Sequence, residues 1–213
     1  MFVRSINHMG TAERKAKEKE ELKELILNAA KKLFIEKGIE QTKIRNIAES
    51  INYSVGTVYV YYKDKNSILH DLHNLGFKQL GGEMRILFAV ADPMERLKAL
   101  GRVYISFALN NPEMYDLMFI MKAPMEFLEA THNDEWNEGR NTFDALRQTV
   151  KQCMEAGYFP GAELEPLSLA IWSTVHGMCS LHIRDRVKAA CLQDSESLVV
   201  RAYEEFLKIV ARK

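Results

Sequence analysis

Hydroxyl and ammonium groups are concentrated in one short stretch of this 213-residue sequence. They belong to Ser54, Thr57, Tyr59, Tyr61 and Lys65. Proteins commonly present such groups to the phosphate oxygens of nucleic acids. The stretch therefore indicates contact with a nucleic-acid backbone more than a catalytic task.

The elements before this stretch are expected to position it. Apolar residues recur at three- and four-residue steps, which predicts an amphipathic helix that ends at Gly38. The members of this stripe are Leu22, Leu25, Ile26, Ala29, Ala30, Leu33 and Phe34. Thr42 is then expected to cap a second helix. The buried face of that helix would be Ile44, Ile47, Ala48 and Ile51.

A tight turn separates the second helix from a third, shorter one. Asn52 and Tyr53 form this turn, because Asn tolerates the left-handed backbone, and Ser54 caps the third helix. That helix carries Val55 and Val58. Two short helices joined in this way have the geometry that places one of them in the major groove of DNA.

These residues resemble the amino-terminal domain of TetR-type transcriptional regulators. The resemblance extends from Ile26 to Leu69 and includes Gly38, Ile47-Ala48, and Gly56 to Tyr62 with Lys65. The sequence departs from the family pattern at three places. Asn52 stands where the family usually has Gly, Tyr53 where it has Val, and Gln41-Thr42 where it has two threonines.

The resemblance implies DNA-binding roles for Lys43, Arg45, Ser54, Val55, Thr57, Tyr59, Tyr61 and Lys65. Thr57 can meet a thymine methyl or a phosphate. Lys65, in the first turn of a helix capped by Asp64, can clamp a phosphate. The alternative is that the tyrosines pack the domain and the lysines are solvated. Tyr62 is expected to be buried, since the family has a Phe there.

The charge distribution is consistent with this division. Lysine and arginine total 29, as do aspartate and glutamate, so the net charge of zero favours no class of partner. Residues 1–65 carry 13 basic and 9 acidic side chains, which leaves an acidic remainder. We expect a DNA-binding domain at residues 1–66, with residues 1–17 as a flexible leader, and a helical effector-binding and dimerisation domain at residues 67–213. Met9 is an alternative start.

Cysteine usage and hydropathy favour a cytoplasmic protein. Cys153, Cys179 and Cys191 are odd in number and far apart, which favours reduced thiols. Residues 1–10 lack the apolar core of a signal peptide, and the apolar runs are too short to span a membrane. We therefore expect no membrane partner.

The sequence after Lys65 predicts further helices and no strand. The expected fold class is all-α: a three-helix helix-turn-helix domain followed by a larger helical domain. A long connecting helix is expected to kink or end at Gly81-Gly82. Asp92-Pro93 and Asn111-Pro112 mark two helix starts. A polar loop is expected over residues 122–134, and the last two helices over residues 163–190 and 195–211.

A short motif marks the carboxy-terminal part of the chain. Residues 172–177, Trp-Ser-Thr-Val-His-Gly, resemble a Trp-x-x-x-His-Gly motif of the carboxy-terminal domains of one TetR subgroup. Trp172 and His176 share one helix face, so they can line an effector pocket with other aromatic and methionine side chains. The expected pocket residues are Tyr104, Phe107, Met114, Met118, Met121, Phe143, Trp172 and His176. The alternative is a methionine-rich core with one hydrogen-bonded histidine.

The resemblance also implies a homodimer formed by the last two helices. The expected interface residues are Leu167, Ile171, Met178, Leu198, Ala202, Phe206 and Ile209. Two helices per subunit can close as a four-helix bundle with twofold symmetry, and such a dimer reads a palindromic operator. Burial within one chain is the alternative for both stripes.

The resulting hypothesis is a ligand-responsive, DNA-binding transcriptional regulator, a repressor released from its operator by a small, largely apolar effector. The alternative is a metal-responsive regulator, because two sets of side chains have the helical spacing of metal ligands. These sets are His70 with His73, and His176 with Cys179 and His182. No cofactor is expected. The sequence lacks a phosphate loop, a nucleophile elbow and a dinucleotide fingerprint, so we do not expect an enzyme.

Overall fold

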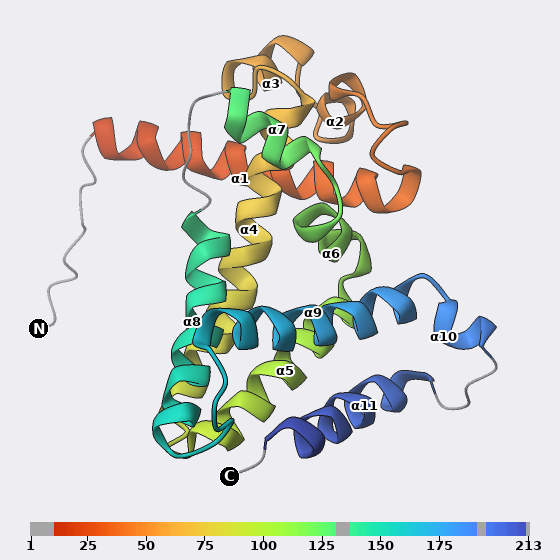
Figure 1. The fold of residues 1–213 in the computed structure, drawn as a ribbon. Helices are drawn as coiled ribbons and strands as arrows, with labels where there is room; N and C mark the ends of the chain where they lie inside the picture. The colour runs from red at the N-terminus through yellow and green to blue at the C-terminus, as the bar shows by residue number, and fades with distance from the viewer. Residues whose placement is uncertain (1–10, 131–136, 191–194, 212–213) are drawn as a thin grey trace, which may run out of the picture. The chain divides into compact units, whose positions relative to one another are not determined.

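The computed structural model describes residues 11–130, 137–190 and 195–211, and each regular element in these ranges is a helix (Figure 1). The all-α fold class expected from the sequence is confirmed. The chain forms two compact units, Met1–Leu72 and His73–Lys213. The boundary between them lies inside one long helix, α4 (Lys65–Ile86).

The amino-terminal unit contains α1 (Thr11–Lys37), α2 (Ile44–Ser50), α3 (Val55–Tyr61) and the first part of α4. α1 ends at Lys37 because Gly38 takes the left-handed backbone, with φ of +81°. α1 includes residues 11–17, so a helix replaces the expected flexible leader over that range. The rest of the expected leader lies outside the described residues.

Apolar side chains close the core of this unit. Ile26 and Ala30 of α1, Ile47 of α2, Val58 of α3 and Ile68 of α4 are fully buried. These positions follow the apolar stripes of the sequence. The fold of the unit is therefore the three-helix arrangement that the sequence predicts.

Thr42 has a different role from the expected one. Its side chain is fully buried, and its Oγ1 donates to the carbonyl of Leu33 at 3.2 Å and to that of Gly38 at 2.9 Å. A buried hydroxyl needs such partners. Thr42 thereby fastens the α1–α2 connection, and Lys43 is the residue that precedes α2 as its N-cap. The prediction that Thr42 caps α2 was wrong.

The turn between α2 and α3 follows the sequence-based expectation. Asn52 has a φ of +58°, which Asn tolerates better than most residues. The Ser54 hydroxyl accepts a hydrogen bond from the Thr57 backbone N–H at 3.0 Å. Ser54 is therefore the N-cap of α3.

Asp71 on α4 joins three elements of the amino-terminal unit. Its Oδ2 lies 2.8 Å from the Lys23 ammonium on α1 and accepts a hydrogen bond from the Tyr62 hydroxyl at 3.1 Å. His70 Nδ1 lies 3.7 Å from Oδ1. Burial alone would raise the pKa of Asp71, but the contacts with His70 and Lys23 outweigh it and hold the pKa at about 2. The carboxylate thus stabilises the folded unit when it is charged.

Removing this charge is expected to destabilise the protein. Asp71→Asn lowers the free energy of unfolding at neutral pH by about 2 kcal/mol, the equivalent of the depressed pKa. Because the folded-state pKa lies below the unfolded value of 3.8, the wild type keeps this contribution above about pH 4 and loses it towards pH 2. Urea unfolding followed by circular dichroism at several pH values measures both effects.

Asp185→Asn is the matched control, because Asp185 is exposed and its φ of +55° suits Asn equally well. This variant should unfold like the wild type. Equal unfolding free energies of Asp71→Asn and the wild type at neutral pH would contradict the role assigned to Asp71.

The carboxy-terminal unit is built around α5 (Pro93–Asn110). The other elements are the rest of α4, η1 (Leu87–Ala89), α6 (Pro112–Phe119), α7 (Ala123–Ala130), α8 (Asn137–Glu155), α9 (Leu164–Ile183), α10 (Arg186–Ala189) and α11 (Ser195–Val210). α5 contacts α6, α8, α9 and α11, and α9 also contacts α8 and α11 (Figure 1). None of the described helices is both long enough and apolar enough to cross a membrane.

Both predicted Pro-containing helix starts are confirmed. Asp92 caps α5 by accepting from the Glu95 N–H at 2.9 Å, and Pro93 occupies the first turn. Pro112 likewise begins α6. The Asn111 side chain, however, donates to the Phe107 carbonyl at 3.0 Å and so closes the end of α5.

Of the kink or end expected at Gly81-Gly82, the end does not occur, because α4 continues as a helix to Ile86. Two expectations about this unit were wrong. α7 occupies residues that were expected to form a polar loop. The helix expected at residues 163–190 is divided, because α9 ends at Ile183 and Asp185 adopts the left-handed backbone before α10.

Two glycines in this unit are expected to respond oppositely to alanine. A methyl group at Gly101 on α5 would collide with the ring of Tyr203, which is held by a 2.9 Å hydrogen bond to the Leu97 carbonyl. Gly101→Ala should lower the free energy of unfolding by about 1–3 kcal/mol. A methyl group at Gly82 has no atom within 4 Å, so Gly82→Ala should stabilise α4 by about 0.5–1 kcal/mol.

Urea unfolding of the two variants beside the wild type measures this difference. A Gly101→Ala protein as stable as the Gly82→Ala protein would show that Tyr203 can move aside.

Candidate DNA-binding surface and ligand cavity

α3 is anchored by one side chain and exposes most of the others. Val58 is fully buried, whereas Tyr59 is 53% exposed and Val60 is 77% exposed. Ser54 and Gly56 are also exposed, and Val55 and Thr57 are half-buried. Ser54 Oγ and Thr57 Oγ1 lie 2.8 Å apart, so the two hydroxyls orient each other at the start of the helix. The exposed face is largely apolar and offers few groups that can read base edges.

The basic residues of α2 lie at its start. Lys43 is exposed, and its backbone N–H donates to the Asn46 side chain at 2.9 Å. Arg45 is exposed and forms an ion pair with Glu49 at 2.8 Å, one turn further along α2. An exposed pair of this kind contributes little stability, so Arg45 can exchange Glu49 for a phosphate at small cost.

Lys65 and the two tyrosines before it differ in exposure. The Lys65 ammonium donates to the Ile39 carbonyl at 2.9 Å, which ties the start of α4 to the α1–α2 connection. An ammonium has two further donors for a phosphate. Asp64 caps α4 as expected, accepting from the Ser67 N–H at 2.7 Å. Tyr61 is half-buried, and Tyr62 is 3% exposed, as the sequence predicts.

Lys43 gives the simplest test of a backbone contact. Lys43→Ala should weaken binding to every duplex by a similar factor and reduce the slope of log affinity against log salt by about 0.9, because one counterion fewer is released. Fluorescence anisotropy of a labelled duplex at several salt concentrations measures both quantities. Lys208→Ala, which removes an exposed lysine on α11, is the control and should leave the slope unchanged. An unchanged slope for Lys43→Ala would show that Lys43 does not contact the DNA backbone.

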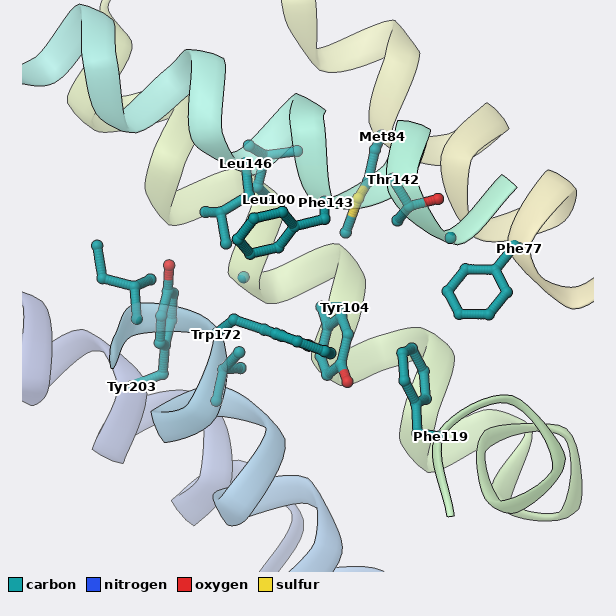
Figure 2. Close-up of a pocket in the computed structure, with 14 residues that line it drawn as sticks. Phe77, Met84, Leu100, Tyr104, Phe119, Thr142, Phe143, Leu146, Trp172 and Tyr203 are labelled. Carbon is teal, nitrogen blue, oxygen red and sulfur yellow. The ribbon is translucent and has the colours of Figure 1, made fainter. Parts of the chain in front are cut away.

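The carboxy-terminal unit encloses an apolar space that we call the aromatic cavity (Figure 2). It is lined by Phe77, Met84, Leu100, Gly101, Tyr104, Phe119, Gly139, Thr142, Phe143, Leu146, Ile171, Trp172, Val175 and Tyr203. These side chains come from α4, α5, α6, α8, α9 and α11. The cavity leaves about 50 Å³ for the centres of water-sized spheres. One water needs roughly 10–15 Å³ by this measure, so a larger ligand must displace wall side chains.

A second space, the methionine groove, adjoins the aromatic cavity and is open to solvent. It is lined by Met118, Phe119, Met121, Met125, Trp172, Ser173 and His176. By the same measure it offers about 310 Å³. Methionine side chains adapt readily to the shape of an occupant.

The expected pocket residues are divided between these spaces and the core. Tyr104, Phe143 and Trp172 line the aromatic cavity. Met118, Met121, Trp172 and His176 line the methionine groove. Phe107 and Met114 are buried and line neither space, which corrects their assignment.

Several lining residues were not predicted from the sequence because they come from helices that are far apart along the chain. Phe77 and Met84 are flanked by glycine or charged residues in α4, and Tyr203 lies among the apolar residues of α11. A signal was available at Gly101, since a glycine inside a strongly amphipathic helix often marks close packing. Its neighbour in space is Tyr203.

The polar groups of the cavity wall are already paired. Thr142 donates to the Glu138 carbonyl and Tyr203 to the Leu97 carbonyl, each at 2.9 Å. The Tyr104 hydroxyl lies 2.9 Å from His176 Nδ1. Among the residues that the structure describes, no charged side chain lines this cavity. The aromatic cavity therefore suits an uncharged, apolar ligand.

His176 lies at the centre of an aromatic cluster. Its Nδ1 is also 2.9 Å from the Tyr115 hydroxyl, and the ring stacks on that of Tyr115 at 5.1 Å between centroids. Burial lowers the pKa of His176, and the charge of Arg184 lowers it further. Burial raises the pKa of Tyr104 and that of Tyr115. The cluster is therefore uncharged at neutral pH.

The expected interface residues differ in exposure. On α11, Val199, Tyr203 and Leu207 face the core, whereas Ile209 is 64% exposed. Leu198, Ala202 and Phe206 are half-buried beside it, as are Leu167 and Met178 on α9. Ile171 is only 1% exposed and lines the aromatic cavity, so its assignment to an interface was wrong. Burial inside one chain excludes it from contact with a second.

The metal alternative finds no support in the part of the chain that the structure describes. No group of three or more His, Cys, Asp or Glu side chains within it could hold a metal ion. Cys153 and Cys179 are free and buried. Cys191 lies outside the described residues.

Family models match both units of the chain. "Bacterial regulatory proteins, tetR family" matches residues 26–72, and "Tetracyclin repressor-like, C-terminal domain" matches residues 97–206. The second match alone covers more than half of the sequence. The chain therefore belongs to the TetR family of DNA-binding transcriptional regulators, which is not a family of enzymes.

Individual relatives are distant. The HTH-type transcriptional regulator AcrR of Shigella flexneri is 24% identical over 155 residues, which are 70% of this chain and 72% of AcrR. PfmR, a TetR-family regulator of Thermus thermophilus, is 21% identical over 86% of this chain and 97% of its own, with a TM-score of 0.64. The fatty acid degradation regulator FadR of Bacillus halodurans is 19% identical over 85% and 92%, with a TM-score of 0.66. A protein of unknown function from Rhodococcus sp. RHA1 is 19% identical over 98% and 100%, with a TM-score of 0.70. These structures share the fold.

Proposed function

We propose that this protein is a homodimeric repressor that binds a palindromic operator in the cytoplasm and leaves it when a small, largely apolar effector occupies the aromatic cavity. The observation that carries this proposal is an uncharged cavity, rich in aromatic side chains, in the unit that follows the helix-turn-helix. Apolar spaces with few polar groups are typical ligand sites. FadR of B. halodurans, which shares the fold, regulates fatty acid degradation, and an effector with an alkyl chain is consistent with this cavity.

α4 is the element that can link the two sites. Its first part, with Ile68 and Asp71, belongs to the amino-terminal unit, and its second part places Phe77 and Met84 in the cavity wall. A ligand that displaces Phe77 or Met84 would shift the whole helix, because α4 is continuous between these residues. The effector then needs only about 1–3 kcal/mol of preference for the form that does not bind DNA.

The dimer proposal is supported by the exposed apolar residues of α9 and α11. Leu169, Leu181 and Ile209 are each more than half exposed. Gly177 on α9 has no atom within 4 Å of an added methyl group, which leaves room for a close helix. Two such helices from each subunit can form a four-helix bundle, which sets the two α3 helices one turn of DNA apart.

The first test is selection of bound sequences from a random duplex pool at physiological salt. A palindrome with half-sites about one helical turn apart would support the dimeric regulator and supply its operator. Effectors are then found as apolar compounds that release the labelled operator in fluorescence anisotropy. No enriched sequence, or an operator that no apolar compound releases, would count against the proposal.

Ile209→Arg tests the dimer directly. The side chain is 64% exposed in one chain, so folding should survive, but a buried charge would break an interface there. We expect a monomer in analytical ultracentrifugation and loss of operator binding. Lys208→Glu, on another face of the same helix, should remain dimeric. A dimeric Ile209→Arg protein would place the interface elsewhere.

A further inference from the structure

Two side chains, Phe119 and Trp172, line both the aromatic cavity and the methionine groove. Their ring centroids lie 6.3 Å apart and the ring planes are tilted by 59°. Figure 2 shows both rings at the cavity wall, Phe119 from α6 and Trp172 from α9. Because one pair of rings faces both spaces, this pair is the partition between them.

The partition matters because the two spaces differ in size and access. The aromatic cavity holds only a few waters, whereas the groove is roomier and open to solvent. Phe119 is the last residue of α6. Its ring also contacts the rings of Phe77, Tyr104, Tyr115 and His176. A ligand that moved the Phe119 ring out of these contacts would join the two spaces into one elongated site.

A second route into the cavity is less suited to an apolar ligand. A polar groove between α4 and α8 shares Phe77 and Thr142 with the cavity. Lys78 and Glu138 lie 3.7 Å apart across it, and Arg85 and Asp144 also line it. An apolar molecule would have to displace the water around these charges, whereas none of the described residues that line the methionine groove has a charged side chain.

His176 gives the methionine groove one polar ring. Its Nδ1 lies 2.9 Å from the hydroxyls of both Tyr104 and Tyr115. The Tyr115 hydroxyl also donates to the His176 carbonyl at 3.0 Å. Because protein hydroxyls already bind Nδ1, Nε2 is the ring nitrogen that can bind a polar group of a ligand.

We propose that the effector is an elongated, uncharged molecule that enters through the methionine groove and passes between Phe119 and Trp172. Its apolar end fills the aromatic cavity, and an uncharged polar group at its other end binds His176 Nε2. This inference rests on the proposed function, because it names the effector class and access route of the same site.

Straight-chain methyl ketones are suitable probes for the shape of the site. Calorimetric titration with acetone, methyl pentyl ketone and methyl nonyl ketone should show affinity rising about fourfold per methylene, the equivalent of about 0.8 kcal/mol. In Leu146→Trp, the new side chain fills the aromatic cavity, so methyl nonyl ketone should bind no more tightly than methyl pentyl ketone. Leu146→Met, close to the wild type in volume, should keep the full rise. Failure of every ketone to bind the wild type would overturn the proposal.

Association kinetics test the route. In a Trp136→Phe background Trp172 is the one remaining tryptophan, and its fluorescence reports the arrival of methyl nonyl ketone in a stopped-flow instrument. Met125→Tyr narrows the methionine groove and should slow association several-fold, whereas Met125→Leu should not. Asn141→Tyr narrows the polar groove and should have no effect. Slower association in Asn141→Tyr alone would overturn the route.

A charged probe tests the ligand class. The straight-chain primary ammonium of the same length as methyl nonyl ketone should bind more weakly, because the described residues around both spaces include no carboxylate. Tighter binding of the ammonium would overturn the assignment of an uncharged effector. Release of operator DNA tests the proposed function separately. A ketone that enters by this route without releasing the operator would contradict ligand-controlled repression, but it would not contradict the route.

Discussion

The continuity of α4 as one helix is the constraint on which the proposed link between ligand binding and DNA binding depends. A helix transmits displacement along its length because each turn is bonded to the next. In this protein one end of α4 carries Asp71, which is bonded to α1 and to the end of α3, and the other carries Phe77 and Met84 of the cavity wall. Gly81 and Gly82 lower the helix propensity of this segment but do not break it.

Local chemistry explains what the sequence could predict. The helix starts at Ser54 and Asp92 and the stop at Gly38 depend on residues within one turn, and each appears as expected. The apolar stripes of α1, α2 and α3 likewise identified the core of the helix-turn-helix. Family resemblance and local periodicity agree in this unit, so its fold followed from the sequence.

Tertiary packing explains what the sequence could not predict. Thr42 looks like a helix cap in sequence, but α1 supplies carbonyl groups that bind its hydroxyl inside the core. Ile171 belongs to an apolar stripe on α9, and only the position of α5 and α8 decides that its side chain faces inward. The cavity combines side chains from α4 to α11, and no spacing within one helix reveals such a combination. Three of its members, Tyr104, Phe143 and Trp172, were nevertheless identified by residue type.

The buried thiols of the carboxy-terminal unit have a consequence for the conditions under which such a regulator operates. Burial raises the pKa of Cys153 and of Cys179 to about 12. Peroxide and disulfides react with the thiolate, and a pKa raised this far makes the thiolate rare at neutral pH. These two cysteines are thus inert towards oxidants while the protein is folded. Oxidants would therefore leave the packing around these two side chains in the folded protein unchanged.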